Sequence, residues 1–184
     1  MKRLVAGLLA GLCLPALANA NDYTYLGLNY LKTSYDEKGF DTSEPSAWSL
    51  RLGTAINENF AIEARLGTGA SSDTLRVDPT MEVEMDIKQL FGVYARAIVP
   101  LGERFSVYGI GGITRAKLEA TGSLVGVPGS RARVSESETD ISLGLGADLM
   151  LSTNAFVNLE YILLQSDEDA YDLDALSLGL GLRF

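Results

Sequence analysis

Residues 81–99 read MEVEMDIKQLFGVYARAIV, and nearly every odd-numbered position, from Met81 to Val99, is apolar. Most even-numbered positions between them are polar or charged, as at Glu82, Asp86 and Arg96. A period of two places successive side chains on opposite faces of a β-strand. The stretch therefore predicts a strand whose odd positions form an apolar outer face and whose even positions form a polar one.

The same alternation recurs along the chain, at residues 26–30, 48–56, 60–66, 105–120, 141–149, 157–163 and 176–184. In 105–120 both sets are mixed, and the apolar outer face is assigned to Tyr108, Ile110, Ala116 and Leu118. That choice groups the glycines with Arg115 on the other face. Eight strands result. Tight connections are expected at 57–59, 100–104 and 152–154, and longer polar ones at about 33–46, 68–80, 121–134 and 165–173.

The composition of the two faces decides between a soluble and a membrane barrel. The polar face is mostly Gly, Ser and Ala with a few charges, which is too little polar surface for a protein in water. It suits the inside of a narrow barrel, while the face rich in Leu, Ile and Val suits lipid. Within hydrocarbon, strands satisfy their backbone hydrogen bonds only in a closed barrel. The sequence therefore predicts an all-β, eight-stranded, antiparallel up-and-down transmembrane β-barrel.

Length and composition exclude several kinds of function. The 184 residues suit one domain. With no His, neither a Ser-His-Asp triad nor an imidazole metal ligand is available, and a single Cys forms no internal disulfide. A net charge of −9 disfavours binding to nucleic acid. We expect a protein that is not an enzyme, carries no cofactor and has no nucleic-acid partner.

The first twenty residues, MKRLVAGLLAGLCLPALANA, have the pattern of a secretory signal. A basic start precedes a short apolar stretch, and Ala18 and Ala20 form a small-x-small cleavage site. We predict a signal peptide at 1–20 and a barrel domain at 21–184. Cys13 belongs to the apolar stretch, so the mature chain is expected to contain no cysteine.

Short motifs in the expected strands are Leu178–Phe184 (LGLGLRF), Leu159-Glu160-Tyr161, Tyr25-Leu26-Gly27, and Gly92–Arg96 followed by Pro100-Leu101-Gly102. With them the chain resembles the small outer-membrane β-barrel family of Gram-negative bacteria. That family includes the membrane domain of outer-membrane protein A and its stand-alone relatives. The resemblance implies a monomer in the outer membrane of a Gram-negative bacterium, reached after secretion across the inner membrane, with both termini in the periplasm.

The resemblance also implies partners. In that family the barrel-assembly machinery reads a terminal aromatic residue and the alternating apolar residues before it, a role that carries over to Leu178, Leu180, Leu182 and Phe184. Outer-membrane lipid and lipopolysaccharide are the expected surroundings. The chain stops at Phe184, where outer-membrane protein A continues into a peptidoglycan-binding domain, so cell-wall anchoring is not expected.

Two functions fit these features. The first is a structural or surface-interaction role, either in membrane integrity or in adhesion through acidic extracellular loops. The alternative is a narrow channel or transporter for small solutes. Lipid-A-modifying enzymes also use small barrels, but many of them depend on a His that this chain lacks.

The alternation places charged side chains on the inner face: Arg51, Glu63, Arg65, Lys88, Arg96, Arg115, Asp148, Glu160 and Arg183. The candidate interior charge network consists of Arg51, Glu63, Arg65, Arg96, Asp148 and Glu160. Paired, these side chains would fill the lumen as a polar plug, which is the structural interpretation, while a gated pore is the functional one. Glu160 is expected to accept hydrogen bonds from an arginine across the barrel.

Of the 24 acidic residues, 18 lie outside the expected membrane band, around its rim. A solvated loop surface explains them, although carboxylate oxygens are also the ligands that Ca²⁺ and Mg²⁺ prefer. The candidates for a divalent cation are Asp167, Glu168 and Asp169. They do not form a calcium-loop motif, so no firm metal site is predicted.

Overall fold

A computed structural model of the protein describes residues 23–37, 42–78, 80–125, 130–166 and 171–184. Its strands are β1 (Thr24–Glu37), β2 (Ser46–Ala55), β3 (Phe60–Ser71), β4 (Asp73–Asp78), β5 (Met81–Pro100), β6 (Phe105–Leu124), β7 (Arg131–Met150), β8 (Ala155–Ser166) and β9 (Tyr171–Arg183). Within these ranges no helix is long and apolar enough to cross a membrane. The predicted signal peptide at 1–20 lies outside the described residues.

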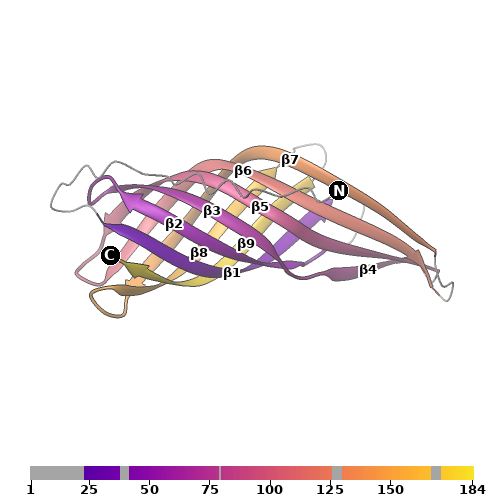
Figure 1. Ribbon diagram of the computed structural model, residues 1–184, viewed down its shortest axis with the longest axis horizontal. Coiled ribbons are helices and arrows are strands. Elements are labelled where there is room, and N and C mark those ends of the chain that lie inside the picture. Colours follow the sequence, from indigo (N-terminus) through magenta and orange to yellow (C-terminus); the bar gives the residue numbers. More distant parts are fainter. Residues whose placement is uncertain (1–22, 38–41, 79, 126–129, 167–170) are drawn as a thin grey trace, which may run out of the picture.

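The strands form one closed antiparallel sheet (Figure 1). Neighbours follow the order β3-β2-β1-β9-β8-β7-β6-β5-β4, and an additional pairing of β3 with β5 closes the ring. β3 pairs with residues 90–97 of β5, and β4 pairs with residues 81–85 of the same strand. β3 and β4 therefore share one position in the wall, and the predicted eight-stranded antiparallel barrel is confirmed.

Tight turns close one end of the barrel, at 56–59, 101–104 and 151–154, as predicted. In the first turn the side-chain oxygen of Asn57 accepts hydrogen bonds from the backbone N–H groups of Asn59 and Phe60, both at 2.9 Å. Gly102 has a φ of 138°, a conformation that side chains other than glycine rarely adopt. Figure 1 shows these turns gathered at the end where the C-terminus lies.

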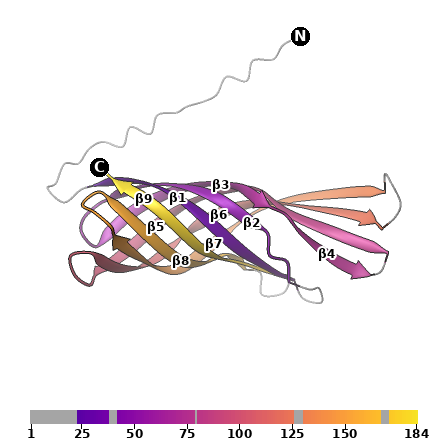
Figure 2. The same ribbon diagram turned by 90° about the horizontal axis from the view of Figure 1, so that it is seen from below.

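At the opposite end, the expected long connections at 68–80 and 121–134 are mostly strand, so that prediction was wrong. β4, residues 81–89 of β5, residues 117–124 of β6 and residues 131–137 of β7 continue beyond the barrel as one sheet (Figure 2), here called the projecting sheet. Residues 68–80 and 121–134 carry few large apolar side chains, as an antiparallel sheet that faces water can, and their composition therefore resembles that of loops. β1 and β8 likewise extend into the loops expected at 33–46 and 165–173.

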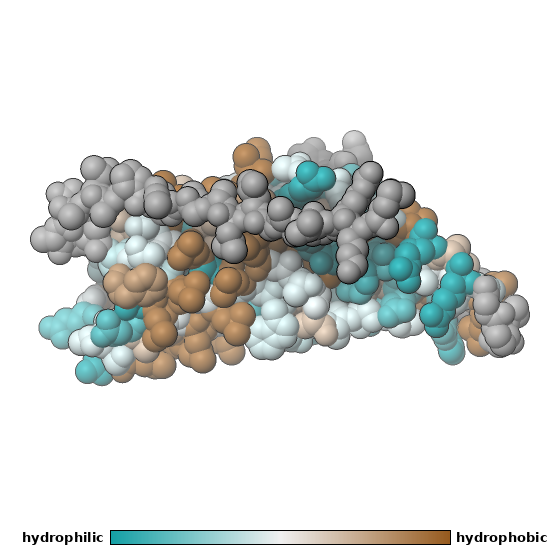
Figure 3. All heavy atoms as spheres, in the orientation of Figure 1, coloured by the Kyte–Doolittle hydropathy of each residue, from teal (hydrophilic) through white to brown (hydrophobic). Residues whose placement is uncertain are grey.

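The outer surface of the barrel carries a broad apolar band, visible as brown spheres in Figure 3. It includes Leu143 at 62% exposure, Leu145 at 73% and Leu180 at 62%. In β1, β2, β3, β7, β8 and β9 the residues that point outward are those the alternation predicted. Apolar side chains at this exposure are stable only against lipid or a partner, so the band defines the face of the barrel that contacts the membrane.

A β-bulge in β5 overturns part of the prediction for residues 81–99. The register with β6 shifts between Ile87 and Gln89, which leaves Lys88 as the extra residue. Ile87 is buried at 1% exposure, whereas Phe91 points outward at 45%. A bulge adds one residue and so exchanges the two faces of a strand. Met81, Val83 and Met85 therefore share the inner face with Ile87, although their odd numbers predicted the outer one.

The face assignment for residues 105–120 was also wrong, because the inner and outer faces are exchanged. Tyr108, Ile110 and Ala116 are buried inside the barrel at 2–4% exposure, while Arg115 is exposed. The strand presents Gly109 outward, where an added Cβ would lie 3.9 Å from the tip of Leu145 of β7 and would contact nothing else among the described residues. The glycines and Arg115 do share one face of β6, but it is the outer face, where Leu143 and Leu145 of β7 lie beside Gly111 and Gly109.

Candidate functional site

The candidate charge network lies inside the barrel. Its six members come from β2, β3, β5, β7 and β8, and each is at most 6% exposed: Arg51, Glu63, Arg65, Arg96, Asp148 and Glu160. Three of them are cationic and three anionic, so the formal charges balance. A buried charge is tolerated when it is paired and hydrogen-bonded, which makes the partners of each group decisive.

Glu63 is the centre of the network. Arg51 donates to it from Nη2 to Oε2 at 2.7 Å and from Nε to Oε1 at 3.1 Å. Arg65 donates to Oε1 from Nε, and Nη1 of Arg96 lies 3.5 Å from Oε2. The hydroxyl of Tyr25 donates to Oε2 at 2.6 Å. One carboxylate thus holds three guanidinium groups together, and without it Arg51 would lose the one ion pair it has among the described residues.

Arg65 crosses the lumen to Glu160. Its Nη1 and Nη2 donate to Oε1 and Oε2 of Glu160 at 2.5 and 2.8 Å, a bidentate pair. β3 and β8 are four strands apart in either direction around the wall, so this pair spans the full width of the barrel. The hydroxyl of Tyr108 also donates to Glu160, at 2.8 Å. The structure thus places Glu160 as the acceptor for an arginine on the opposite wall of the barrel, the role expected for it.

Arg96 completes the network on the other side. Its Nη2 donates to Oδ2 of Asp148 at 2.8 Å, and Nη1 donates to the hydroxyl of Tyr25 at 3.0 Å. The guanidinium lies 3.7 Å from the centre of the Tyr108 ring. The guanidinium of Arg65 likewise lies over an aromatic ring, 4.6 Å from the centre of the Tyr94 ring. Cation–π contacts of this kind stabilise desolvated arginines.

The tyrosines of this site were not predicted from the sequence. What marks them is a glycine at the position directly opposite on the neighbouring strand. Each inward ring lies directly opposite an inward glycine: Tyr25 opposite Gly53, Tyr94 opposite Gly112, Tyr108 opposite Gly146, and Phe156 opposite Gly181. A Cβ on any of these glycines would collide with the ring that faces it. The inward glycines therefore make room for rings that support the arginines. Because each glycine and its ring lie on different strands, the pairing can be recognised only once the strand register is known.

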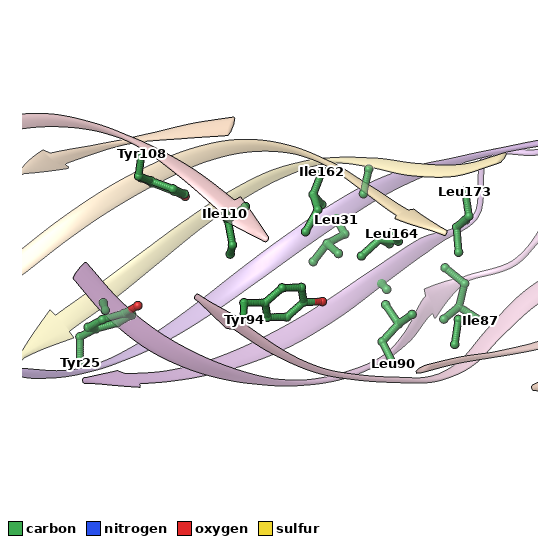
Figure 4. Close-up of a cluster of buried hydrophobic side chains, with 14 of the residues drawn as sticks. Tyr25, Leu31, Ile87, Leu90, Tyr94, Tyr108, Ile110, Ile162, Leu164 and Leu173 are labelled. Atoms are coloured by element: carbon green, nitrogen blue, oxygen red, sulfur yellow. The ribbon is translucent and has the colours of Figure 1, made fainter. Parts of the chain in front are cut away.

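A layer of apolar side chains closes the lumen on the side of the projecting sheet (Figure 4). Leu31, Ile87, Leu90, Ile162, Leu164 and Leu173 are at most 5% exposed and form this layer. Between it and the charges, hydroxyls form a chain in which Thr114 lies 2.5 Å from both Tyr94 and Ser142, and Ser142 donates to the carbonyl of Leu164 at 2.7 Å. The interior is thus filled by two successive layers along the barrel, one of paired charges and one of apolar side chains.

Of the three other charges expected inside, Lys88 and Arg115 lie elsewhere, while Arg183 keeps the inner face, opposite Tyr25, at the mouth of the barrel. Lys88 is exposed because it is the extra residue of the bulge, and Arg115 is exposed because β6 has the opposite face assignment. Arg183 is half-buried beside the turns, where its guanidinium lies 4.3 Å from the centre of the Tyr23 ring. None of them shares an ion pair with the six-residue network in the part of the chain that the structure describes.

The remaining candidates have clear positions. The predicted assembly-signal residues lie on the outer face of β9 and at its end, at 57–72% exposure: Leu178, Leu180, Leu182 and Phe184. The divalent-cation candidates Asp167, Glu168 and Asp169 and the cleavage-site residues Ala18 and Ala20 lie outside the described residues. Among the residues that are described, no group of three or more acidic side chains is placed to hold a metal ion.

A closed antiparallel barrel with an apolar outer band and a charge-paired interior is a transmembrane β-barrel. The family model of the outer membrane protein beta-barrel domain matches residues 4–184, and the chain belongs to this family. It is therefore a protein of the Gram-negative outer membrane, as the resemblance implied. Proteins of this family and fold are generally not enzymes.

Solved structures of similar fold agree. Ail, the attachment invasion locus protein of Yersinia pestis, has a TM-score of 0.65 and 18% identity, covering 89% of this chain and 99% of its own. Neisserial surface protein A has a TM-score of 0.54 and 15% identity, covering 88% and 97%. OprG from Pseudomonas aeruginosa has a TM-score of 0.54 and 13% identity, covering 90% and 96%. At these identities the likeness establishes the fold alone.

A curated relative of a different kind also matches. DNA polymerase IV of Corynebacterium diphtheriae is 31% identical over 115 residues, 58% of this chain, and the chain spans only 23% of the length of the polymerase. Because most of that protein lies outside the match, its activity does not transfer to this chain.

Proposed function

We propose that this protein is a non-conducting outer-membrane barrel with a structural or surface-contact role. The observation that carries the proposal is the Arg65–Glu160 pair, which spans the lumen between opposite walls and joins the rest of the charge network. An eight-stranded barrel is only wide enough for its own side chains. A path for solutes would have to separate this pair, and breaking a buried pair typically costs about 3–5 kcal/mol.

The apolar layer adds a second barrier in series. Even with the charges separated, an ion would meet the apolar side chains of Leu31, Ile162, Leu173 and the other members of the layer. Moving an unpaired charge into apolar surroundings is costly. The two levels support a closed barrel more strongly than either does alone.

The projecting sheet supports the surface-contact part of the proposal. It extends beyond the barrel, and β7 has no described partner on the β8 side before Leu143, where pairing with Leu163 begins. Strand edges and loops that stand clear of a membrane are available to other molecules. Adhesion through this end, or a contribution to membrane integrity, is the role we assign to it.

The leader, the assembly signal, the oligomeric state and the lipid surroundings belong to the same proposal. Residues 1–20 act as a cleaved signal peptide, and the exposed apolar residues of β9 that end at Phe184 act as the signal for the barrel-assembly machinery. The protein works as a monomer without a cofactor. Lipopolysaccharide surrounds its outer half.

Recordings from planar lipid bilayers test the closed lumen. The purified wild-type barrel is expected to give no steady single-channel current. Glu160→Ala removes the acceptor of Arg65 and should produce current fluctuations or a less stable barrel, while Glu160→Gln keeps an acceptor and should resemble the wild type more closely. A steady wild-type conductance that Glu160→Ala does not change would favour the narrow channel instead.

A further inference from the structure

The outward face of β5, β6 and β7 changes character at one level. On the barrel side of that level, Val93, Ile113 and Ile141 stand opposite one another and are exposed at 48%, 56% and 67%. Arg115 is the next outward residue of β6 after Ile113, and Lys117 is the one after that. On β6 the apolar band therefore ends where two cationic side chains begin, while Phe91 of β5, opposite Arg115, is still apolar and 45% exposed.

Arg115 and Lys117 are not engaged by the protein itself. Both are exposed, and among the described residues no carboxylate lies within ion-pair distance of either group. Their register partners on β7 are Thr139 and Ser137, whose side chains share the outward face. Two cations and two hydroxyls thus stand together just beyond the apolar band, on a chain whose net charge is −9.

Glu119, the next outward residue of β6 after Lys117, and Asp86 opposite it on β5 are already compensated. Nζ of Lys88 lies 2.5 Å from Oδ2 of Asp86 and 3.2 Å from Oε1 of Glu119. Nε of Arg133 lies 3.4 Å from the same oxygen of Glu119. The hydrogen bonds to Asp86 and Glu119 raise the pKa of Lys88, so it remains protonated. An anion that approaches Arg115 therefore meets little repulsion from this part of the sheet.

We propose that Arg115 and Lys117 bind the phosphate groups of lipid A in the outer leaflet. Those phosphates lie just beyond the acyl chains, at the level where the apolar band ends. Arginine forms bidentate hydrogen bonds with phosphate, and lysine adds a point charge. The hydroxyls of Ser137 and Thr139 face the sugar hydroxyls beside the phosphates. The site rests on the outer-membrane location and on the lipopolysaccharide surroundings proposed above, and it does not depend on the closed lumen or on adhesion.

The surface just below the cations suits acyl chains. Ile113, Ile141 and Leu143 give an exposed aliphatic surface, and β6 presents Gly109 and Gly111 outward with no side chain of their own. A lipid whose phosphates contact Arg115 can therefore lay its chains flat along β6 and β7. The basic pair and this aliphatic surface are parts of one lipid site.

Native mass spectrometry of the purified barrel in detergent, titrated with bisphosphorylated lipid A, tests the site. Arg115→Gln with Lys117→Gln is expected to weaken binding roughly tenfold or more, because each basic residue near a membrane surface adds to its attraction for anionic lipid. Arg76→Gln with Arg131→Gln removes the same charge farther out on the projecting sheet and should stay within about twofold of the wild type. Slower migration on boiling, in gels containing SDS, checks that each variant is folded.

Comparison of lipids on the wild type alone gives a second measure that needs no variant. Bisphosphorylated lipid A should bind roughly tenfold more tightly than lipid A stripped of phosphate, and more tightly than phosphatidylglycerol. Equal binding of the three lipids would overturn the proposal, and equal losses in the two double variants would overturn it as well. The first result would indicate general apolar contact and the second a general charge effect.

Discussion

The barrel and the projecting sheet are built from the same strands with opposite polarity. In the barrel, apolar side chains such as Val93 and Leu143 face outward, and the charges of Glu63 and Arg65 face inward. In the projecting sheet, Met81, Val83 and Met85 share the face of buried Ile87, while Glu82, Glu84 and Asp86 lie on the outer face. The environment explains the difference, because one region is surrounded by lipid and the other by water.

A single bulge makes this exchange possible without a break in the alternation. From Met81 to Val99 the odd positions stay apolar almost throughout, yet Lys88 adds a residue opposite β6 and moves them from one face to the other. β8 has a similar register shift between Leu163 and Gln165, where Leu164 and Gln165 are both buried. Periodicity therefore defines two faces, and the bulges decide which face points inward.

The largest expected effect separates an inner carboxylate from an outer one. Glu63→Ala leaves three buried arginines without a shared partner and should destabilise the barrel by at least about 3–5 kcal/mol. Glu84→Ala, on the exposed outer face of the projecting sheet, should change stability by no more than about 0.5 kcal/mol. Urea unfolding in lipid vesicles, followed by the fluorescence of the single Trp48, measures both.

Equal losses in these two variants would mean that the inner charges are solvated, and the contrast between the two regions would fail. Glu63→Gln sharpens the result, since it keeps acceptors for the arginines and removes the charge. It should fall between the wild type and Glu63→Ala in the same unfolding measurement.

A pair of glycines on β6 tests the difference between inside and outside at one level of the barrel. An added Cβ on Gly112 would collide with the backbone carbonyl of Val93 and with Tyr94. Gly112→Ala should therefore cost about 1–3 kcal/mol, as overpacked cores do. Gly109→Ala meets only the tip of Leu145, at 3.9 Å, and should cost less than about 0.5 kcal/mol. Similar unfolding midpoints for the two variants would contradict this packing.

The contrast also explains what the sequence predicts and what it does not. The lipid face requires an unbroken row of apolar side chains, so the strands, the tight turns and the closed barrel follow from alternation alone. The inward position of Glu63 and Glu160 follows from the same rule. An arginine partner for Glu160 across the barrel was also expected, but alternation does not say which arginine, because the Arg65–Glu160 pair depends on the register of strands on opposite walls. Tyr108 was misplaced because its inward position depends on Gly146 of the next strand, which alternation within one strand does not show.

The bulge itself can be tested with cysteines, because the expected mature chain has none of its own. A cysteine replacing Glu84 should react with a bulky maleimide severalfold faster than one replacing Val83, because Val83 shares the inner face with Ile87. Deleting Lys88 removes the extra residue, so the two halves of β5 should join in regular register. The cysteine at position 84 should still react faster than the one at position 83. Faster labelling at Val83 in the wild type would mean that the alternation runs through without a bulge.

The smallest expected effect concerns ion pairs in the two regions and their response to salt. Nη2 of Arg76 lies 2.6 Å from Oε1 of Glu82, with the arginine side chain 65% exposed, whereas Arg51 and Glu63 are about 1% exposed or less. Exposed pairs contribute about 1 kcal/mol or less, and salt near 1 M screens them over about 3 Å. Arg76→Ala should therefore speed hydrogen exchange of β4 less than about fivefold at low salt, and not at all in 1 M NaCl. Arg51→Ala should destabilise the barrel equally at both salt concentrations, because its partner is shielded from solvent ions. If the loss of stability in Arg51→Ala became smaller as salt rises, in parallel with the effect of Arg76→Ala, salt ions would have to reach the lumen. The inner and outer ion pairs would then not differ in kind.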